Sequence, residues 1–149
     1  MTNANRPAEL AAHPFAIALP IQWGDQDSFG HVNNAIYFRW FESARVAYLD
    51  QPELLRILEP HQLGPILASI KCDFRRQLKY PDTVEISASV THIGRTSVKM
   101  SHLLYSQAQA AIAAEGDSTI VVFDYATQRP TPVPADVRAA LERIEGKTF

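Results

Sequence analysis

The stretch WGDQDSFGHVNNAIYFRWFESAR, residues 23–45, places a dense polar loop directly before a long apolar segment. The loop is rich in turn-forming residues, namely Gly24, Asp25, Asp27, Ser28 and Gly30. From residue 34 to residue 49, apolar side chains recur at helical spacing and cover far more than the single stripe of an ordinary amphipathic helix. This pattern predicts a helix of about 16 residues that is buried on most sides.

The remainder of the chain reads mainly as β-strands. Residues 15–23 alternate with period two, which indicates a half-buried strand. Pro20 favours an edge position or a bulge, because proline cannot donate to a ladder. Similar alternation predicts further strands over residues 66–74, 83–93, 95–105 and 118–126, with turns at 80–82, 93–95 and 115–117. A short helix is expected from Pro52 to the residue before Pro60. A final amphipathic helix carries three apolar residues on one face: Val137, Leu141 and Ile144.

The order of these elements, a strand, a long helix and then about four antiparallel strands, predicts one α+β domain. We expect residues 1–14 to be a flexible N-terminal leader and residues 15–149 to form the domain. One helix is only ~10–12 Å across, whereas five strands at ~4.8 Å spacing span more than about 20 Å. A sheet curved around the helix would keep open edges, and pairing of two copies would close them, so a homodimer is predicted.

Composition limits the classes of function. The chain of 149 residues is 46% hydrophobic and 20% charged, which is typical of a soluble globular domain. Its net charge of -2 gives no general attraction for nucleic acid or an anionic membrane surface. The single cysteine, Cys72, excludes an internal disulfide and is interpreted as a small buried hydrophobe. Because no signal peptide and no run of ~18 apolar residues is recognisable, a soluble, cytoplasmic protein is expected.

Two interpretations of the polar loop are open. In the structural one, the aspartates and glycines form an ordinary turn, and an asparagine caps the helix. In the functional one, the loop folds the Asp27 carboxylate back toward the helix start at Asn33 and Asn34. Since a helix start presents unpaired N–H groups and partial positive charge, this pair could carry out acyl transfer without a serine or cysteine nucleophile.

Other catalytic signatures are absent from the sequence. It contains no G-x-S-x-G, no H-E-x-x-H, no phosphate-binding P-loop and no G-x-G-x-x-G. Its 5 histidines show no metal-ligand spacing, so no bound metal is expected.

The segment from Gly24 to Arg45 resembles the D-x-D-x-x-G-H-V-N-N-x-x-Y-x-x-W-x-E-x-A-R signature of hot-dog-fold acyl-CoA thioesterases, the group typified by 4-hydroxybenzoyl-CoA thioesterase. Looser similarity at THIGRTSV and RPTPVPADVRAAL extends the resemblance over residues 15–141. It implies a hot-dog fold, in which an antiparallel five-stranded sheet wraps around one long central helix, and a homodimer or homotetramer. It also implies hydrolysis of an acyl-CoA to a free acid and coenzyme A, with no cofactor beyond the coenzyme A of the substrate.

The same resemblance assigns roles to individual residues. The catalytic carboxylate falls on Asp27, as general base on water or as direct nucleophile, and the amide that polarises the carbonyl falls on Asn34. His31 and Asn33 take secondary roles in orienting water or Asp27. The coenzyme A contacts, expected across the dimer interface, fall on polar residues of two turns: Arg95 and Thr96, with Gln77 and Lys79 as weaker candidates.

Glu42 is a second carboxylate of interest, because some hot-dog thioesterases use a glutamate on the helix for catalysis. It lies eight residues after Asn34, about 12 Å along the helix, and is therefore expected to pair with Arg39 or Arg45 instead. Two other activities stay open: a hot-dog hydratase or dehydratase acting on acyl thioesters, and a non-catalytic acyl-CoA-binding protein.

Overall fold

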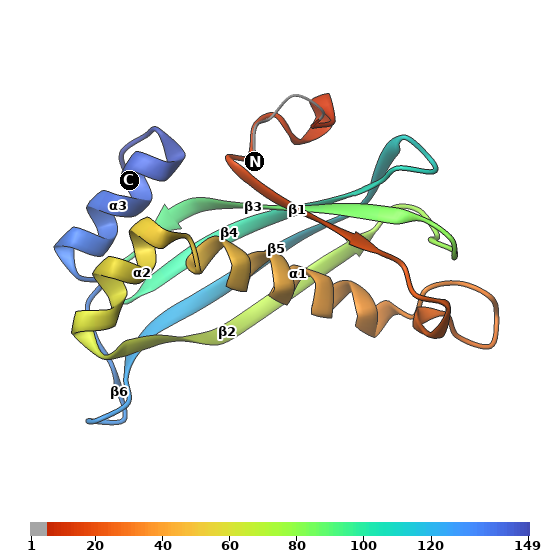
Figure 1. Ribbon diagram of the computed structural model, residues 1–149. Helices are drawn as coiled ribbons and strands as arrows, with labels where there is room; N and C mark the ends of the chain where they lie inside the picture. Colours follow the sequence, from red (N-terminus) through yellow and green to blue (C-terminus); the bar gives the residue numbers. More distant parts are fainter. Residues whose placement is uncertain (1–5) are drawn as a thin grey trace.

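The structure is a computed structural model that describes residues 6–149. One antiparallel sheet curls around helix α1 (Asn34–Leu49), which lies across its inner face (Figure 1). The sheet order is β1-β3-β4-β5-β2, and a short β6 pairs with the end of β5. The strands are β1 (Phe15–Pro20), β2 (Leu63–Phe74), β3 (Thr83–Ile93), β4 (Ser97–Ser106), β5 (Ala111–Asp124) and β6 (Arg129–Pro130). The predicted α+β hot-dog architecture is confirmed.

Helix α1 has the bounds that the sequence predicts. Its N-cap is Asn33, whose side-chain oxygen accepts a hydrogen bond from the Ala35 N–H at 2.9 Å. Such a cap satisfies one of the N–H groups that every helix start leaves without a partner inside the helix. Six side chains of α1 are buried: Tyr37, Trp40, Phe41, Ala44, Arg45 and Tyr48. The helix start is therefore held in place by a rigid, packed element.

Strand β5 corrects the predicted turn at residues 115–117. These residues lie inside the strand, where Gly116 pairs with Cys72 on β2 and with His102 on β4. A Cβ atom on Gly116 would overlap the Phe41 ring and approach the backbone oxygen of Lys71 to 2.7 Å. The glycine therefore permits close approach of α1 to the sheet rather than a change of chain direction.

The connection between β4 and β5 lies earlier in the chain than predicted, at residues 107–110. It contains no glycine or proline, and Ala110 adopts a left-handed conformation with φ of 49°. Because turn prediction relies on glycine and proline, the position of this turn was not visible in the sequence.

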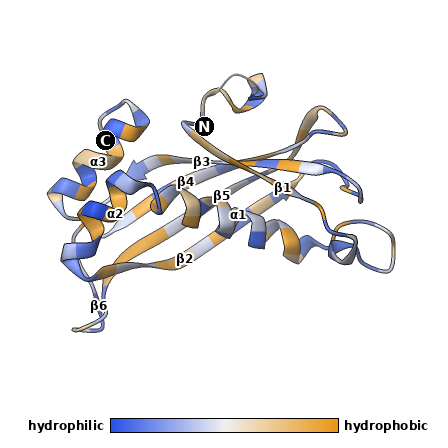
Figure 2. Cartoon of the chain, viewed as in Figure 1, coloured by the Kyte–Doolittle hydropathy of each residue, from blue (hydrophilic) through white to orange (hydrophobic). Residues whose placement is uncertain are grey.

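The sheet has β1 and β2 at its two edges, so Pro20 at the end of β1 occupies the predicted edge position. Helix α2 (Pro52–Leu58) begins at the predicted proline, and a 3₁₀ turn, η3 (Glu59–His61), follows it. Helix α3 (Ala135–Glu145) packs beside α2 at one end of the sheet (Figure 1). Both helices carry hydrophobic and hydrophilic residues side by side (Figure 2). Their apolar sides close that end of the core, as the sequence predicts for α3.

The described part of the leader, residues 6–14, lies against the sheet and is not a free tail. It forms a 3₁₀ turn, η1 (Ala8–Leu10), in which Leu10 is fully buried. The His13 ring hydrogen-bonds the Ser87 hydroxyl at 2.7 Å and the Ser101 hydroxyl at 3.3 Å. For residues 1–5, which lie outside the described residues, a flexible leader stays a prediction. Within residues 6–149, no helix is long and apolar enough to cross a membrane.

Candidate active site

The loop before α1 folds back on itself, as the functional interpretation requires. The Asn33 N–H donates to the carbonyl oxygen of Asp25 at 2.9 Å, and the Asp27 N–H donates to that of His31 at 2.8 Å. Together with the 3₁₀ turn η2 (Trp23–Asp25), these bonds make a tight hairpin. Asp27 is therefore opposite His31, which precedes the first helical residue, Asn34, by three positions.

The Asp27 side chain is exposed and partly fixed by its own loop. One carboxylate oxygen, Oδ1, accepts a hydrogen bond from the Phe29 N–H at 2.9 Å. Gly30 closes the turn with its N–H on the Asp27 carbonyl oxygen at 3.1 Å, in a left-handed conformation that favours glycine. No donor in the described residues 6–149 pairs with Asp27 Oδ2. That oxygen can therefore accept a proton or contact a substrate.

The backbone N–H of Asn34 is a free donor at the start of α1. The next two N–H groups are satisfied, since Ala35 donates to the Asn33 side chain and Ile36 donates to the Asn33 carbonyl oxygen at 3.0 Å. In the described part of the chain, no acceptor pairs with the Asn34 N–H. Because the helix dipole adds partial positive charge here, this N–H is suited to a polarised carbonyl oxygen. Asn33 acts as the helix cap, and its role in orienting water stays a prediction.

A cavity of about 240 Å³ opens beside Asn34. Its lining comes from the loop, α1 and the end of β2: His31, Val32, Asn34, Tyr37, Phe74, Arg75, Arg76 and Gln77. The structure thus brings together three of the predicted site residues, His31, Asn34 and Gln77, whereas Asp27 does not line this cavity.

Tyr37 is a buried tyrosine in the lining of the same cavity. Its hydroxyl donates to the Arg76 carbonyl oxygen at 3.4 Å. Burial raises the pKa of Tyr37 to about 12, so the phenol stays protonated at neutral pH and remains a hydrogen-bond donor.

Gln77 also lines a neighbouring cavity of about 550 Å³, which Lys79 shares. The Gln77 carbonyl oxygen accepts a hydrogen bond from the Gln109 side chain at 2.7 Å, which fixes this segment. An exposed ammonium group beside an open cavity is suited to a phosphate oxygen. Two of the four predicted coenzyme A residues therefore lie next to the cavity at Asn34.

Arg95 and Thr96 lie far from both cavities within one chain. Strand β3 begins at Thr83, next to the segment that hydrogen-bonds the loop, and it ends at Ile93. At ~3.3 Å per residue these ends are about 33 Å apart, and the turn with Arg95 and Thr96 follows the far end. Within one chain, these two residues are therefore not beside the cavity at Asn34.

An ion pair that the sequence analysis missed ties the loop to α1. Arg39 donates to the buried carboxylate of Asp25 at 2.8 Å, and the second oxygen of that carboxylate accepts the Gln22 N–H at 2.8 Å. Of the two partners expected for Glu42, Arg39 is therefore paired with Asp25 instead, and Arg45 is the arginine whose pKa the Glu42 charge affects. Burial lowers the pKa of Arg45 below its ordinary value. The exposed Glu42 carboxylate partly offsets this lowering. A charged arginine within an apolar helix indicates that Arg39 has an acidic partner. That partner, Asp25, lies outside the helix, so helical spacing could not identify it.

Within residues 6–149, no group of three or more His, Cys, Asp or Glu side chains is arranged to hold a metal ion. Cys72 is half-buried, and burial raises the pKa of its thiol to about 11. The thiol therefore stays protonated at neutral pH and is a poor nucleophile.

Residues 21–141 match the family model of the thioesterase-like superfamily. The chain belongs to this superfamily. A putative thioesterase of Pseudomonas aeruginosa, PA2801, is 32% identical in sequence and has a TM-score of 0.74, with coverage of 87% of this chain and 98% of that chain. A thioesterase of Thermus thermophilus, solved with coenzyme A and Zn, is 27% identical and has a TM-score of 0.79, with coverage of 93% and 99%.

A curated relative is the long-chain acyl-CoA thioesterase FadM of Escherichia coli (strain K12). It is 24% identical over 118 residues, which are 79% of this chain and 89% of that protein. As a member of the thioesterase-like superfamily, the present protein is an enzyme of the thioester hydrolase class. Its site offers a free amide at a helix start and a carboxylate on the adjoining loop, which is chemistry suited to a thioester carbonyl.

Proposed function

We propose that this thioesterase-like protein hydrolyses an acyl-CoA thioester to a free carboxylic acid and coenzyme A. The observation that carries the proposal is the free N–H of Asn34, a residue that lines a cavity and follows the loop that holds Asp27. The substrate class is supported by the acyl-CoA thioesterase FadM and by the Thermus relative solved with coenzyme A. No cofactor is proposed beyond the coenzyme A of the substrate.

In the proposed reaction, the thioester carbonyl oxygen accepts a hydrogen bond from the Asn34 N–H. Negative charge grows on this oxygen as the carbonyl carbon is attacked, and one well-placed donor lowers such a barrier by ~3–4 kcal/mol. In one route Asp27 takes a proton from the attacking water, the carbon–sulfur bond breaks and coenzyme A leaves as the thiol; such general-base help contributes about 10²–10⁴ in rate. In the other route Asp27 attacks the carbonyl carbon and expels the coenzyme A thiolate, and water then hydrolyses the resulting anhydride to the free acid and the Asp27 carboxylate. His31, in the cavity wall, is proposed to orient water, and Asn33 holds Asn34 through its helix cap.

We also propose that the active form is a homodimer, or a homotetramer built from it. Two features support this assembly. Strand β2 is an edge strand, so its outer N–H and C=O groups are open to pairing with a second copy. The predicted coenzyme A residues Arg95 and Thr96 lie at the far end of the sheet, and a partner subunit could present them to the cavity at Asn34.

The test is release of free thiol from a panel of acyl-CoA substrates, compared between the native protein and Asp27→Asn. The variant is expected to lose at least about a hundredfold in kcat with its fold intact. Asp124→Asn is a matched control, because Asp124 Oδ1 accepts the N–H two residues later, Ala126, at 2.8 Å, as Asp27 does with Phe29. Asparagine preserves such a turn while removing the charge.

Near-native activity of Asp27→Asn would reject Asp27 as the catalytic carboxylate. Addition of water to an enoyl-CoA without thiol release would favour the hydratase alternative. Binding of acyl-CoA without any turnover would favour the non-catalytic alternative.

A cytoplasmic location, and the absence of nucleic-acid and membrane partners, stay predictions. The net charge of -2 supports the second of these, since it offers no general attraction for polyanions. Fractionation of cells that produce the protein would test the location directly.

A further inference from the structure

A short segment separates the two cavities near the start of α1. Arg76 and Gln77 line both the cavity of about 240 Å³ at Asn34 and the neighbouring cavity of about 550 Å³. These two residues and the buried Leu78 that follows them are called the wall segment. A ligand that reaches from one cavity into the other passes along this segment.

The wall segment is held from two sides. On the side of the cavity at Asn34, the Leu78 carbonyl oxygen accepts the Val32 N–H at 2.8 Å. On the side of the larger cavity, the Gln77 carbonyl oxygen accepts a hydrogen bond from the Gln109 side chain at 2.7 Å. Within residues 6–149, Gln109 is the one partner of that oxygen. The Gln109 side chain therefore ties the wall segment to the turn between β4 and β5.

The turn that carries Gln109 is fixed by bonds that do not use its side chain. The Asp82 carboxylate accepts the Ala108 N–H at 2.9 Å and the Ser106 hydroxyl at 2.5 Å. The Ser106 oxygen in turn accepts the Gln109 N–H at 3.1 Å. Replacement of the Gln109 side chain should therefore free the wall segment and leave the turn in place.

The larger cavity carries positive charge. Its lining includes Arg76 and Lys79, which are both exposed, and within the described residues neither of them belongs to an ion pair. The carboxylate in this lining, Asp82, already accepts the hydrogen bonds of the turn. Guanidinium and ammonium groups are the usual partners of phosphate oxygens in proteins. The cavity is therefore suited to a phosphate-bearing part of a ligand.

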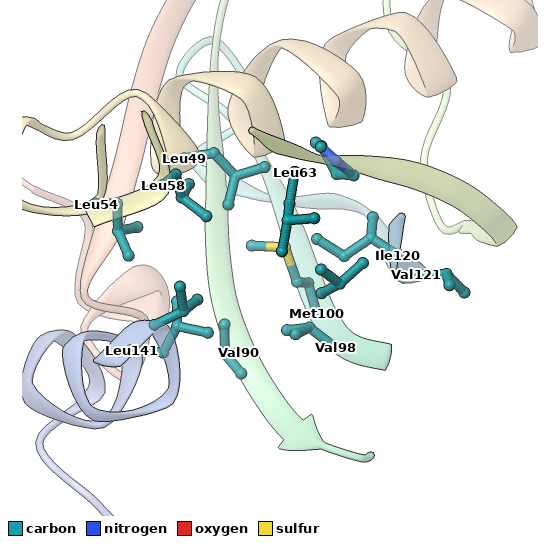
Figure 3. A pocket seen from close by; sticks show the side chains of 14 residues that line it. Leu49, Leu54, Leu58, Leu63, Val90, Val98, Met100, Ile120, Val121 and Leu141 are labelled. Carbon is teal, nitrogen blue, oxygen red and sulfur yellow. The ribbon is translucent and has the colours of Figure 1, made fainter. Parts of the chain in front are cut away.

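Two other hollow regions lack this charge. Figure 3 shows the apolar chamber of about 60 Å³, on which leucine and valine side chains and Met100 converge without any charged group. The open groove of about 480 Å³ beside α2 has two acids in its lining, Asp50 and Glu59, against one base, Arg56. Neither region offers a phosphate group the excess of positive charge found beside the wall segment.

We infer that Gln109 is a positioning residue for the coenzyme A part of the substrate, because its side chain holds the wall segment in place beside Arg76 and Lys79. This inference rests on the proposed thioesterase function. Val32 holds the opposite side of the segment independently, so loss of the Gln109 bond should weaken substrate binding and leave the chemical step intact. A neutral hydrogen bond contributes roughly 2–10-fold to an equilibrium constant. A loss confined to binding appears in KM and not in kcat.

The experiment compares two substrates that carry the same acyl group. One is an acyl-CoA that the native protein hydrolyses, and the other is the corresponding acyl-pantetheine thioester, which lacks the nucleotide and all phosphates. Gln109→Met keeps a side chain of similar length and removes the N–H donor. The variant should raise KM for the acyl-CoA by about 3–10-fold, with kcat within about twofold of the native value. KM for the acyl-pantetheine thioester should not change.

Gln107→Met is the matched control. Gln107 lies in the same turn, is exposed as Gln109 is, and donates to the Glu85 carboxylate at 2.9 Å, but it is in the lining of neither cavity. Its substitution should leave KM and kcat unchanged for both substrates. Gln109→Ser, whose side chain is too short to reach the wall segment, should raise KM as Gln109→Met does and covers the case in which Gln109→Met fails to fold.

The outcomes separate this inference from the proposed function. An unchanged KM for the acyl-CoA in the folded Gln109 variants overturns the inference and leaves the proposed function standing. A rise of equal size for the acyl-pantetheine thioester, or in Gln107→Met, also overturns it, because the effect would then not depend on the phosphates or on the wall segment. Release of thiol from no acyl-CoA by the native protein would remove the proposed function itself.

Discussion

Arg39 on α1 donates a 2.8 Å hydrogen bond to Asp25, whose side chain is only 5% exposed although it belongs to the loop before the helix. The same carboxylate accepts the Gln22 N–H, and the Asp25 carbonyl oxygen accepts the Asn33 N–H. The first aspartate of the pair therefore shapes the loop, which leaves the second, Asp27, available for chemistry.

Removal of Asp25 should cost more stability than removal of its partner. Asp25→Ala leaves the Gln22 N–H without its acceptor and should lower the free energy of unfolding by about 1–3 kcal/mol. Arg39 is 59% exposed and its charge is solvated, so Arg39→Ala should cost about 1 kcal/mol or less. Urea unfolding of both variants measures the difference. Equal losses would show that the ion pair, and not the backbone bond to Gln22, holds the loop.

Gly116→Ala should be strongly destabilising. Its Cβ would meet the Phe41 ring and the Lys71 backbone, and overpacking of this kind costs about 1–3 kcal/mol. Gly24→Ala is the matched control, because no heavy atom lies within 4 Å of a Cβ built there. Thermal unfolding of the two variants provides the comparison. A native melting temperature for Gly116→Ala would contradict the close packing of α1 on β5.

Stability should fall as the pH is lowered from 7 to 4, in part because of His102. Its ring is buried between the Ser87 carbonyl oxygen and the Ser118 hydroxyl, and burial lowers its pKa to about 4 from an ordinary value near 6.5. Between these two values the unfolded chain binds a proton that the folded chain does not. Acid therefore favours unfolding, by up to about 3 kcal/mol from this group.

His102→Gln keeps hydrogen-bonding capacity but removes this titration, so its free energy of unfolding should vary less between pH 7 and pH 4. Denaturant titrations at several pH values test this. An unchanged pH dependence would assign the acid sensitivity to other groups, of which His13 is one, since burial lowers its pKa as well.

The long helix was predictable because its signals are local. The Asn33 cap, the apolar run behind it and the glycine of the preceding loop all act within a few residues, and α1 has the predicted bounds. The β strands were predictable for the same reason, since alternation is a local property. Gly116 was misread because a glycine marks either a turn or a close approach, and only the position of Phe41 decides between them.

The site was predictable in its parts but not in its assembly. The signature pointed to Asp27 and Asn34, and the loop does fold back on the helix start. The partner of Arg39 could not be predicted, because Asp25 lies fourteen residues earlier and meets it only through that fold of the loop. The distance of Arg95 and Thr96 from the cavity follows from the direction of β3, which becomes definite only in the assembled sheet.

The central claim is that the Asn34 N–H polarises the thioester carbonyl. Its most direct test removes this N–H and keeps the helix. Asn34→Pro does this, since proline is favoured at the first helical position and Asn33 already has φ of -62° and ψ of 139°, which suits the residue before proline. Asn34→Ala is the control, because it changes the side chain and keeps the N–H. We predict that kcat for acyl-CoA hydrolysis falls by about 10²–10³ in Asn34→Pro and changes by less than about threefold in Asn34→Ala. A folded Asn34→Pro protein with native kcat would contradict the role of this amide in polarising the thioester.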